Sequence, residues 1–107
     1  MTVKLSQVQK TMLEQLAASD PYFRGSLGVD VILVDGENKI RMHTKQGKGT
    51  FVNVDMEYVP SSDLYKLAFH RGHALRPDKL VSLEVDDVFV ADVYDIIRKK
   101  IHEVLYG

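Results

Sequence analysis

Apolar and polar residues alternate in two runs in the middle of the chain, 51–59 and 64–71, which Pro60 to Asp63 separate. Such alternation is typical of half-buried strands, and the intervening residues are suited to a turn. With Val59 facing Leu64, Val54 lies opposite Phe69, Met56 opposite Leu67, Tyr58 opposite Tyr65, Glu57 opposite Lys66 and Asn53 opposite His70. This register separates an apolar face from a polar face, and a shift of one residue would destroy the separation. The pattern therefore predicts an antiparallel hairpin.

Three further segments have the character of strands. Residues 29–34 are rich in β-branched side chains and are followed by turn residues at 35–38. Residues 40–44 alternate, and the glycines within 46–49 lead into the central hairpin. Residues 80–86 alternate again, which predicts a fifth strand. The order of these segments predicts an antiparallel meander of four or five strands, with Met42 opposite Val52 and Ile40 opposite Val54.

An amphipathic helix is predicted before the strands. Its apolar residues recur at spacings of three and four, at Leu5, Val8, Met12 and Leu16. Ser6 and Gln9 fit a capping box that would start the helix, and Pro21 disfavours helical backbone at the residue before it. Residues 21–28 are expected to form a loop.

A second amphipathic helix is predicted at the C-terminal end. Its stripe consists of Val90, Val93, Ile97, Ile101 and Val104 or Leu105, with Asp86 or Asp87 as the expected cap. Two such helices suffice to cover one face of the sheet. We therefore expect residues 1–107 to form a single α+β domain, a two-layer sandwich with both helices packed on one face of the meander.

Three apolar residues do not fit the polar face of this sheet. If Val31 and Leu33 share the core face with the second strand, then Ile32, Val34 and Phe51 fall on the opposite, solvated face. A contiguous apolar patch is unfavourable on a monomer. The pattern therefore predicts a homodimer that buries this edge, for example by pairing the first strand with its symmetry mate. Alternatively, residues 19–28 or the fifth strand cover the patch within one chain.

The amino-acid composition limits the classes of protein to which the chain can belong. Hydrophobic residues make up 45% and charged residues 27% of the 107 residues, as in an ordinary globular protein. Cysteine is absent, which excludes disulfides, thiolate catalysis and cysteine-built zinc sites and is compatible with the cytoplasm, the expected location. No apolar run is long enough to span a membrane, and the first residues lack the apolar core of a signal peptide. A net charge of −1 predicts no general attraction to nucleic acid, so such attraction requires a local patch.

Such a patch is predicted at one end of the sheet. In a meander, the loops at 45–49 and 72–79 lie together, opposite the turns at 35–38 and 60–63. The first end gathers the cations Lys45, Lys48, Arg71, His73, Arg76 and Lys79, whereas the second bears Asp35, Glu37 and Asp63. The basic loop end is therefore the candidate site for an anion, the alternative being that these loops are simply solvated.

Catalytic and metal chemistry have weaker support. His43, His70 and His73 are candidate metal ligands, but their spacing matches no established ligand pattern. Asp55 and Glu57 share a strand face without a visible difference in environment, and no nucleophile with its base can be assembled. Tyr58, Tyr65 and Phe69 lie on the apolar face and are expected to be core residues. The sequence therefore predicts no cofactor and no catalytic residue.

Three functions are compatible with these features. The first is a small non-catalytic binding module whose basic loop end meets a nucleic-acid backbone or an acidic protein surface. The second is a homodimeric interaction or adaptor domain, and the third is a small enzyme or metal-dependent protein that uses the histidines and carboxylates. The concentration of cations at one end of the sheet favours the first function, and the absence of a catalytic pattern weakens the third.

Overall fold

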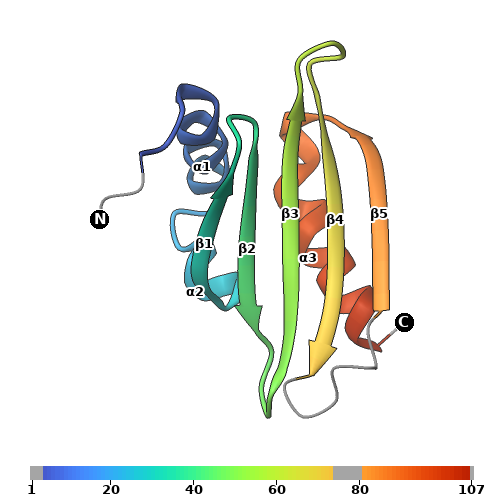
Figure 1. Cartoon of the computed structure of the whole chain (residues 1–107). Coiled ribbons are helices and arrows are strands. Elements are labelled where there is room, and N and C mark those ends of the chain that lie inside the picture. The colour runs from blue at the N-terminus through green and yellow to red at the C-terminus, as the bar shows by residue number, and fades with distance from the viewer. Residues whose placement is uncertain (1–3, 74–80, 107) are drawn as a thin grey trace.

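A computed structural model describes residues 4–73 and 81–106 of the chain. The elements are α1 (Gln7–Ser19), α2 (Phe23–Leu27), β1 (Val29–Asp35), β2 (Lys39–Lys45), β3 (Thr50–Val59), β4 (Leu64–His73), β5 (Val81–Val88), η1 (Val90–Asp92) and α3 (Val93–Tyr106). The strands form one antiparallel sheet in the order β1-β2-β3-β4-β5 (Figure 1). The predicted α+β meander between two terminal helices is thus confirmed, and it has five strands.

The central hairpin has the predicted register. β3 and β4 pair so that Val54 lies opposite Phe69, Met56 opposite Leu67 and Glu57 opposite Lys66. β2 is displaced from its predicted position by two residues, because Met42 lies opposite Val54 rather than Val52. A shift of two residues keeps every side chain on its face, so the apolar face stays continuous despite this error.

The predicted orientation of β1 is wrong. Its pairing with β2 shifts between Val29 and Val31, where one extra residue interrupts the alternation. Such a bulge moves all later side chains to the other face. Ile32 and Val34 consequently pack against the core, whereas Val31 and Leu33 are 45% and 54% exposed on the polar face.

The N-terminal helix begins as predicted and is fixed to the first hairpin. Ser6 and Gln9 form the capping box. Gln9 is buried, and its side-chain amide donates hydrogen bonds to the carbonyls of Gly36 and Lys39 at 3.1 and 3.0 Å. One glutamine therefore caps α1 and also holds it against the turn between β1 and β2.

The segment predicted as a loop, 21–28, contains the short helix α2. Phe23 and Leu27, four residues apart, are buried beneath it. Gly28 ends the helix with a φ of 74°, and a Cβ there would lie 2.7 Å from the carbonyl oxygen of Lys45. Both the left-handed backbone and the close approach require glycine.

The C-terminal helix begins later than predicted. Asp86 and Asp87 belong to β5, and the N-cap of η1 is Phe89. The stripe of α3 is buried at Val93, Ile97, Ile101 and Val104, as predicted, but Val90 is 47% exposed. Buried Tyr94 adds a contact with the end of α1, because its hydroxyl donates to Asp20 at 2.5 Å.

The hydrophobic core joins the helices to one face of the sheet. A single cluster contains residues of α1, α2 and α3 together with the inward residues of the strands, among them Met12, Leu16, Ile97, Met56 and Phe69. The three helices lie behind the sheet in Figure 1, so that its polar face is turned to the viewer. No helix in the described part of the chain is long and apolar enough to cross a membrane.

Candidate functional site

The polar face of the sheet is organised around Asp55 on β3. Only 7% of its side chain is exposed, and Arg41 on β2 donates two hydrogen bonds to it, of 2.6 and 2.8 Å. Lys39 Nζ and His70 Nε2 lie 3.9 and 3.6 Å from the same carboxylate. The forked guanidinium pairing fixes the carboxylate geometrically.

Opposing effects act on the pKa of Asp55. Burial raises it, but the hydrogen bonds from Arg41 and the charges of Arg41, Lys39 and His70 outweigh burial, so the pKa is lowered. The same pairing raises the pKa of Arg41. Asp55 is therefore an ionised carboxylate held by cations, which is unsuitable for a general acid.

Ser82 adds a residue that was not singled out from the sequence. Its Oγ lies 3.0 Å from Nδ1 of His70, whose Nε2 in turn faces Asp55. A serine, a histidine and an aspartate thus follow one another across β5, β4 and β3. Both oxygens of Asp55 accept from Arg41 at shorter distances than the 3.6 Å to His70. The carboxylate of Asp55 therefore pairs chiefly with the guanidinium of Arg41. Ser82, His70 and Asp55 form a row of polar contacts across three strands rather than a catalytic triad.

A second polar contact, between a histidine and a carboxylate, lies nearer the β1 edge. His43 Nδ1 is 2.7 Å from Asp30 Oδ1, and this hydrogen bond holds the pKa of Asp30 below its usual value. The imidazole of His43 also stacks on Phe51, with ring centroids 5.1 Å apart. His43 and His70 are thus engaged by different carboxylates, and the side chain of His73 lies outside the described residues. Among the side chains that the structure describes, no three His, Asp or Glu residues are grouped to hold a metal ion.

The cations predicted at the basic loop end are only partly brought together. Lys45 is exposed but lies 3.6 Å from Asp30, and Lys48 is exposed in the turn after β2. Arg71 instead donates a 3.2 Å hydrogen bond to the carbonyl of Leu105, near the C-terminal end of α3, where a cation is favoured. The backbone of His73 ends β4, whereas Arg76 and Lys79 lie outside the described residues. Anion binding at this end stays a prediction.

The apolar residues of the β1 edge differ from the predicted set. Val31 and Leu33 are exposed there, in place of Ile32 and Val34. Phe51 does lie on the polar face but is half-buried between His43 and β4. Within the part of the chain that the structure describes, β1 is an edge strand with two exposed apolar side chains. The dimer stays a prediction at the same edge, with Val31 and Leu33 in place of Ile32 and Val34.

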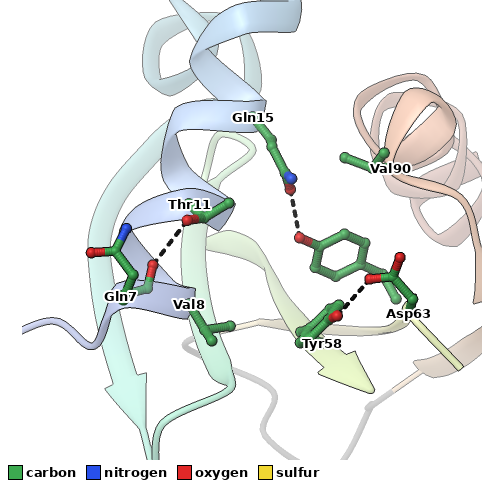
Figure 2. Close-up of a pocket in the computed structure, with 8 residues that line it drawn as sticks. Gln7, Val8, Thr11, Gln15, Tyr58, Asp63 and Val90 are labelled. Carbon is green, nitrogen blue, oxygen red and sulfur yellow. Dashed lines mark hydrogen bonds between the residues drawn. The ribbon is translucent and has the colours of Figure 1, made fainter. Parts of the chain in front are cut away.

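A pocket of about 340 Å³ opens between α1, the β3–β4 hairpin and η1 (Figure 2). Its lining comprises Gln7, Val8, Thr11 and Gln15 of α1, Tyr58, Asp63 and Tyr65 of the hairpin, and Val90 of η1. Residues 7, 11 and 15 follow one face of the helix, which explains why α1 contributes half of the lining. The sequence could not reveal the pocket, because its residues come from three separate elements.

Two tyrosines form the floor of this pocket and donate hydrogen bonds within it. Tyr58 donates to Asp63 and Tyr65 to Gln15, each at 2.5 Å. The hydrogen bond to Asp63 raises the pKa of Tyr58, and burial raises that of Tyr65, so both phenols are neutral near pH 7. Tyr65 is buried like a core residue, as expected, but half-buried Tyr58 borders the pocket. The sequence signal that could have indicated these contacts is that a buried phenolic hydroxyl needs a hydrogen-bond partner.

Comparison with known proteins gives no relative. A scan against protein-family models finds no match, and searches among curated proteins and solved structures find no similar protein. The function must therefore be inferred from the side chains of this chain.

Proposed function

We propose that this chain is a non-catalytic protein-interaction domain that works as a homodimer joined through β1. The observation that carries the proposal is the exposure of Val31 and Leu33, 45% and 54%, on a strand at the border of the sheet (Figure 1). An edge strand offers backbone groups to another strand, and exposed apolar side chains add area to be buried. The three helices would close the opposite face in a two-layer sandwich and leave this edge for the second copy.

One antiparallel register between two copies of β1 suits both side chains. If Ile32 lies opposite Ile32 of the second copy, Val31 lies opposite Leu33 twice, once on each side of the symmetry axis. The same register places Asp30 opposite Val34, so no like charges face each other. Centring the pair on Leu33 instead would set Val31 opposite Asp35. The register centred on Ile32 is therefore the one we propose.

The charge distribution also favours a second copy as the occupant. The turns after β1 and β3 bear exposed Asp35, Glu37 and Asp63, whereas exposed Lys45 and Lys48 border the turn at the other end of the sheet (Figure 1). Antiparallel pairing of β1 sets the acidic end of each copy beside the basic end of the other. Opposite potentials then face each other across the interface, which favours this pairing over a parallel one.

Sedimentation velocity across a wide range of protein concentration tests this proposal. We expect a reversible dimer of micromolar affinity, because a single pair of edge strands makes a small interface. Leu33→Asp places a carboxylate at the centre of the contact and should leave a monomer. Tyr106→Asp is the matched control, because Tyr106 is 75% exposed on α3, away from β1. A wild-type chain that stays monomeric at high micromolar concentration would remove the proposal.

Binding of an anionic partner at the basic loop end is the second candidate function. One observation favours it: Lys45 keeps 74% of its side chain exposed although Asp30 is near. Backbone-directed binding of this kind weakens steeply as salt rises. Titration of polyphosphate or DNA at low salt tests it, with the Lys45→Glu/Lys48→Glu double variant expected to abolish binding. If the wild-type chain binds neither polymer, this candidate is excluded.

A further inference from the structure

We propose that the pocket between α1, the β3–β4 hairpin and η1 binds an alkylated ammonium group, held against the ring of Tyr58 beside the carboxylate of Asp63 (Figure 2). This site is separate from the β1 edge and does not depend on dimerisation. Three features of the pocket lead to the proposal, namely its charge, its aromatic floor and its size.

The charge of the lining selects a cation. Among the described residues that line the pocket, Asp63 is charged and the others are neutral. Within the described residues, no lysine, arginine or histidine forms an ion pair with Asp63, and its carboxylate accepts a hydrogen bond from the hydroxyl of Tyr58. A carboxylate at the mouth of a partly enclosed pocket attracts a positive ligand and disfavours phosphate or carboxylate groups. The complementary ligand is therefore cationic.

The aromatic floor selects the kind of cation. Half-buried Tyr58 offers part of its ring to the pocket, whereas Tyr65 is only 4% exposed. The two rings have centroids 5.5 Å apart and planes tilted by 57°, so Tyr65 supports the ring of Tyr58. Their hydroxyls are occupied by Asp63 and Gln15, which fixes both rings in place. An alkylated ammonium has few or no N–H groups to donate, and ring faces attract such a diffuse charge. Val8 and Val90, on opposite sides of the pocket, offer apolar contacts for its methyl groups (Figure 2).

The size of the pocket limits the ligand. A volume of about 340 Å³ is near the lower end of the range for small-molecule sites. It admits an ammonium head with a short chain. The same head group occurs in free compounds such as choline and in the trimethylated side chain of lysine in a peptide. Both kinds of ligand present the same trimethylammonium group to the pocket, and the titrations below distinguish a free compound from a peptide.

Titrations followed by NMR of the intact chain test the proposal. The probes are choline, its uncharged isostere 3,3-dimethyl-1-butanol, and a short peptide with trimethyllysine or with unmodified lysine. We expect saturable shifts at the pocket residues with choline or the trimethyllysine peptide, and at least about tenfold weaker binding of the matching control ligand. The tighter of the two ammonium probes identifies the source. Equal binding of choline and its isostere, or no saturable binding of either ammonium probe, would overturn the proposal.

Variants locate the site. Asp63→Asn removes the charge at a position with a φ of 57°, a conformation that asparagine tolerates, and should weaken binding about tenfold. Asp35→Asn removes the same charge from the neighbouring turn at the same end of the sheet, and it should change affinity less than twofold if contact rather than general potential matters. Tyr58→Leu should abolish binding, whereas Tyr58→Phe, which keeps the ring, should retain it. Equal losses in Asp63→Asn and Asp35→Asn would contradict a contact at Asp63.

Discussion

The ring of Phe51 on β3 lies across Gly72 on β4, so closely that a Cβ on Gly72 would come within 2.5 Å of the tip of the ring. His43 stacks on the same ring, with centroids 5.1 Å apart. An aromatic side chain over a glycine on the neighbouring strand covers backbone that would otherwise be open to water. The ring of Phe51 is therefore packed against residues of its own chain, which explains why an apolar residue is tolerated on the polar face.

This contact predicts that Gly72→Ala destabilises the fold. The new methyl group would displace the ring of Phe51 from His43, and forced repacking of this kind costs about 1–3 kcal/mol. In Phe51→Ala/Gly72→Ala the obstacle is gone, so the double variant should lose less than the sum of the single losses in urea denaturation. Gly25→Ala is the control, because a Cβ there meets nothing within 4 Å. Strictly additive losses would show that the ring does not rest on Gly72.

A second prediction concerns the register of the central hairpin. Met56 and Leu67 lie opposite each other and are completely buried. Truncation of either leaves a cavity beneath the helices, so Met56→Ala and Leu67→Ala should each lower the free energy of unfolding by about 2–5 kcal/mol. Tyr22→Ala, at a position 80% exposed and outside β1, is the control and should change stability much less. Denaturation midpoints unchanged by both core substitutions would be incompatible with this register.

The hairpin could be predicted from the sequence because several independent signals agree on it. Its alternation, its turn residues and the opposition of Glu57 to Lys66 all require the same pairing, and it was found. For β1 the alternation of its side chains was the only signal. The bulge between Val29 and Val31 inserts one residue and so turns every later side chain to the opposite face of the sheet. The exposed residues of the edge were therefore assigned to the wrong face, although the position of the strand was right.

The site residues were harder to predict because they depend on contacts between elements. α2 has only five residues, too few for helical periodicity to be recognised. Ser82 meets His70 only once the pairing of β4 with β5 is known, and Gln15 meets Tyr65 across fifty positions of sequence. Arg71, which looked like one member of a basic cluster, binds the last turn of α3. Residue type and order along the chain contain none of these relationships.

The last prediction concerns Asp55 and acid. Because the pKa of Asp55 is lowered in the folded state, its ion pairs stabilise the fold fully above the unfolded-state pKa of about 3.9, and this contribution is lost as the pH falls further. Asp55→Asn removes the charge and leaves Arg41 without its carboxylate, so at pH 7 it should cost about 1.5–3 kcal/mol, as expected for hydrogen bonds to charged groups. Urea denaturation of both proteins from pH 7 to pH 2 should show a constant difference down to about pH 5 and a shrinking one below pH 4. Asp86→Asn is the control, since Asp86 is 66% exposed, lies 4.0 Å from Lys66, and forms a surface pair of little expected worth. A difference between wild type and Asp55→Asn that is independent of pH would mean that Arg41 does not stabilise the ionised carboxylate.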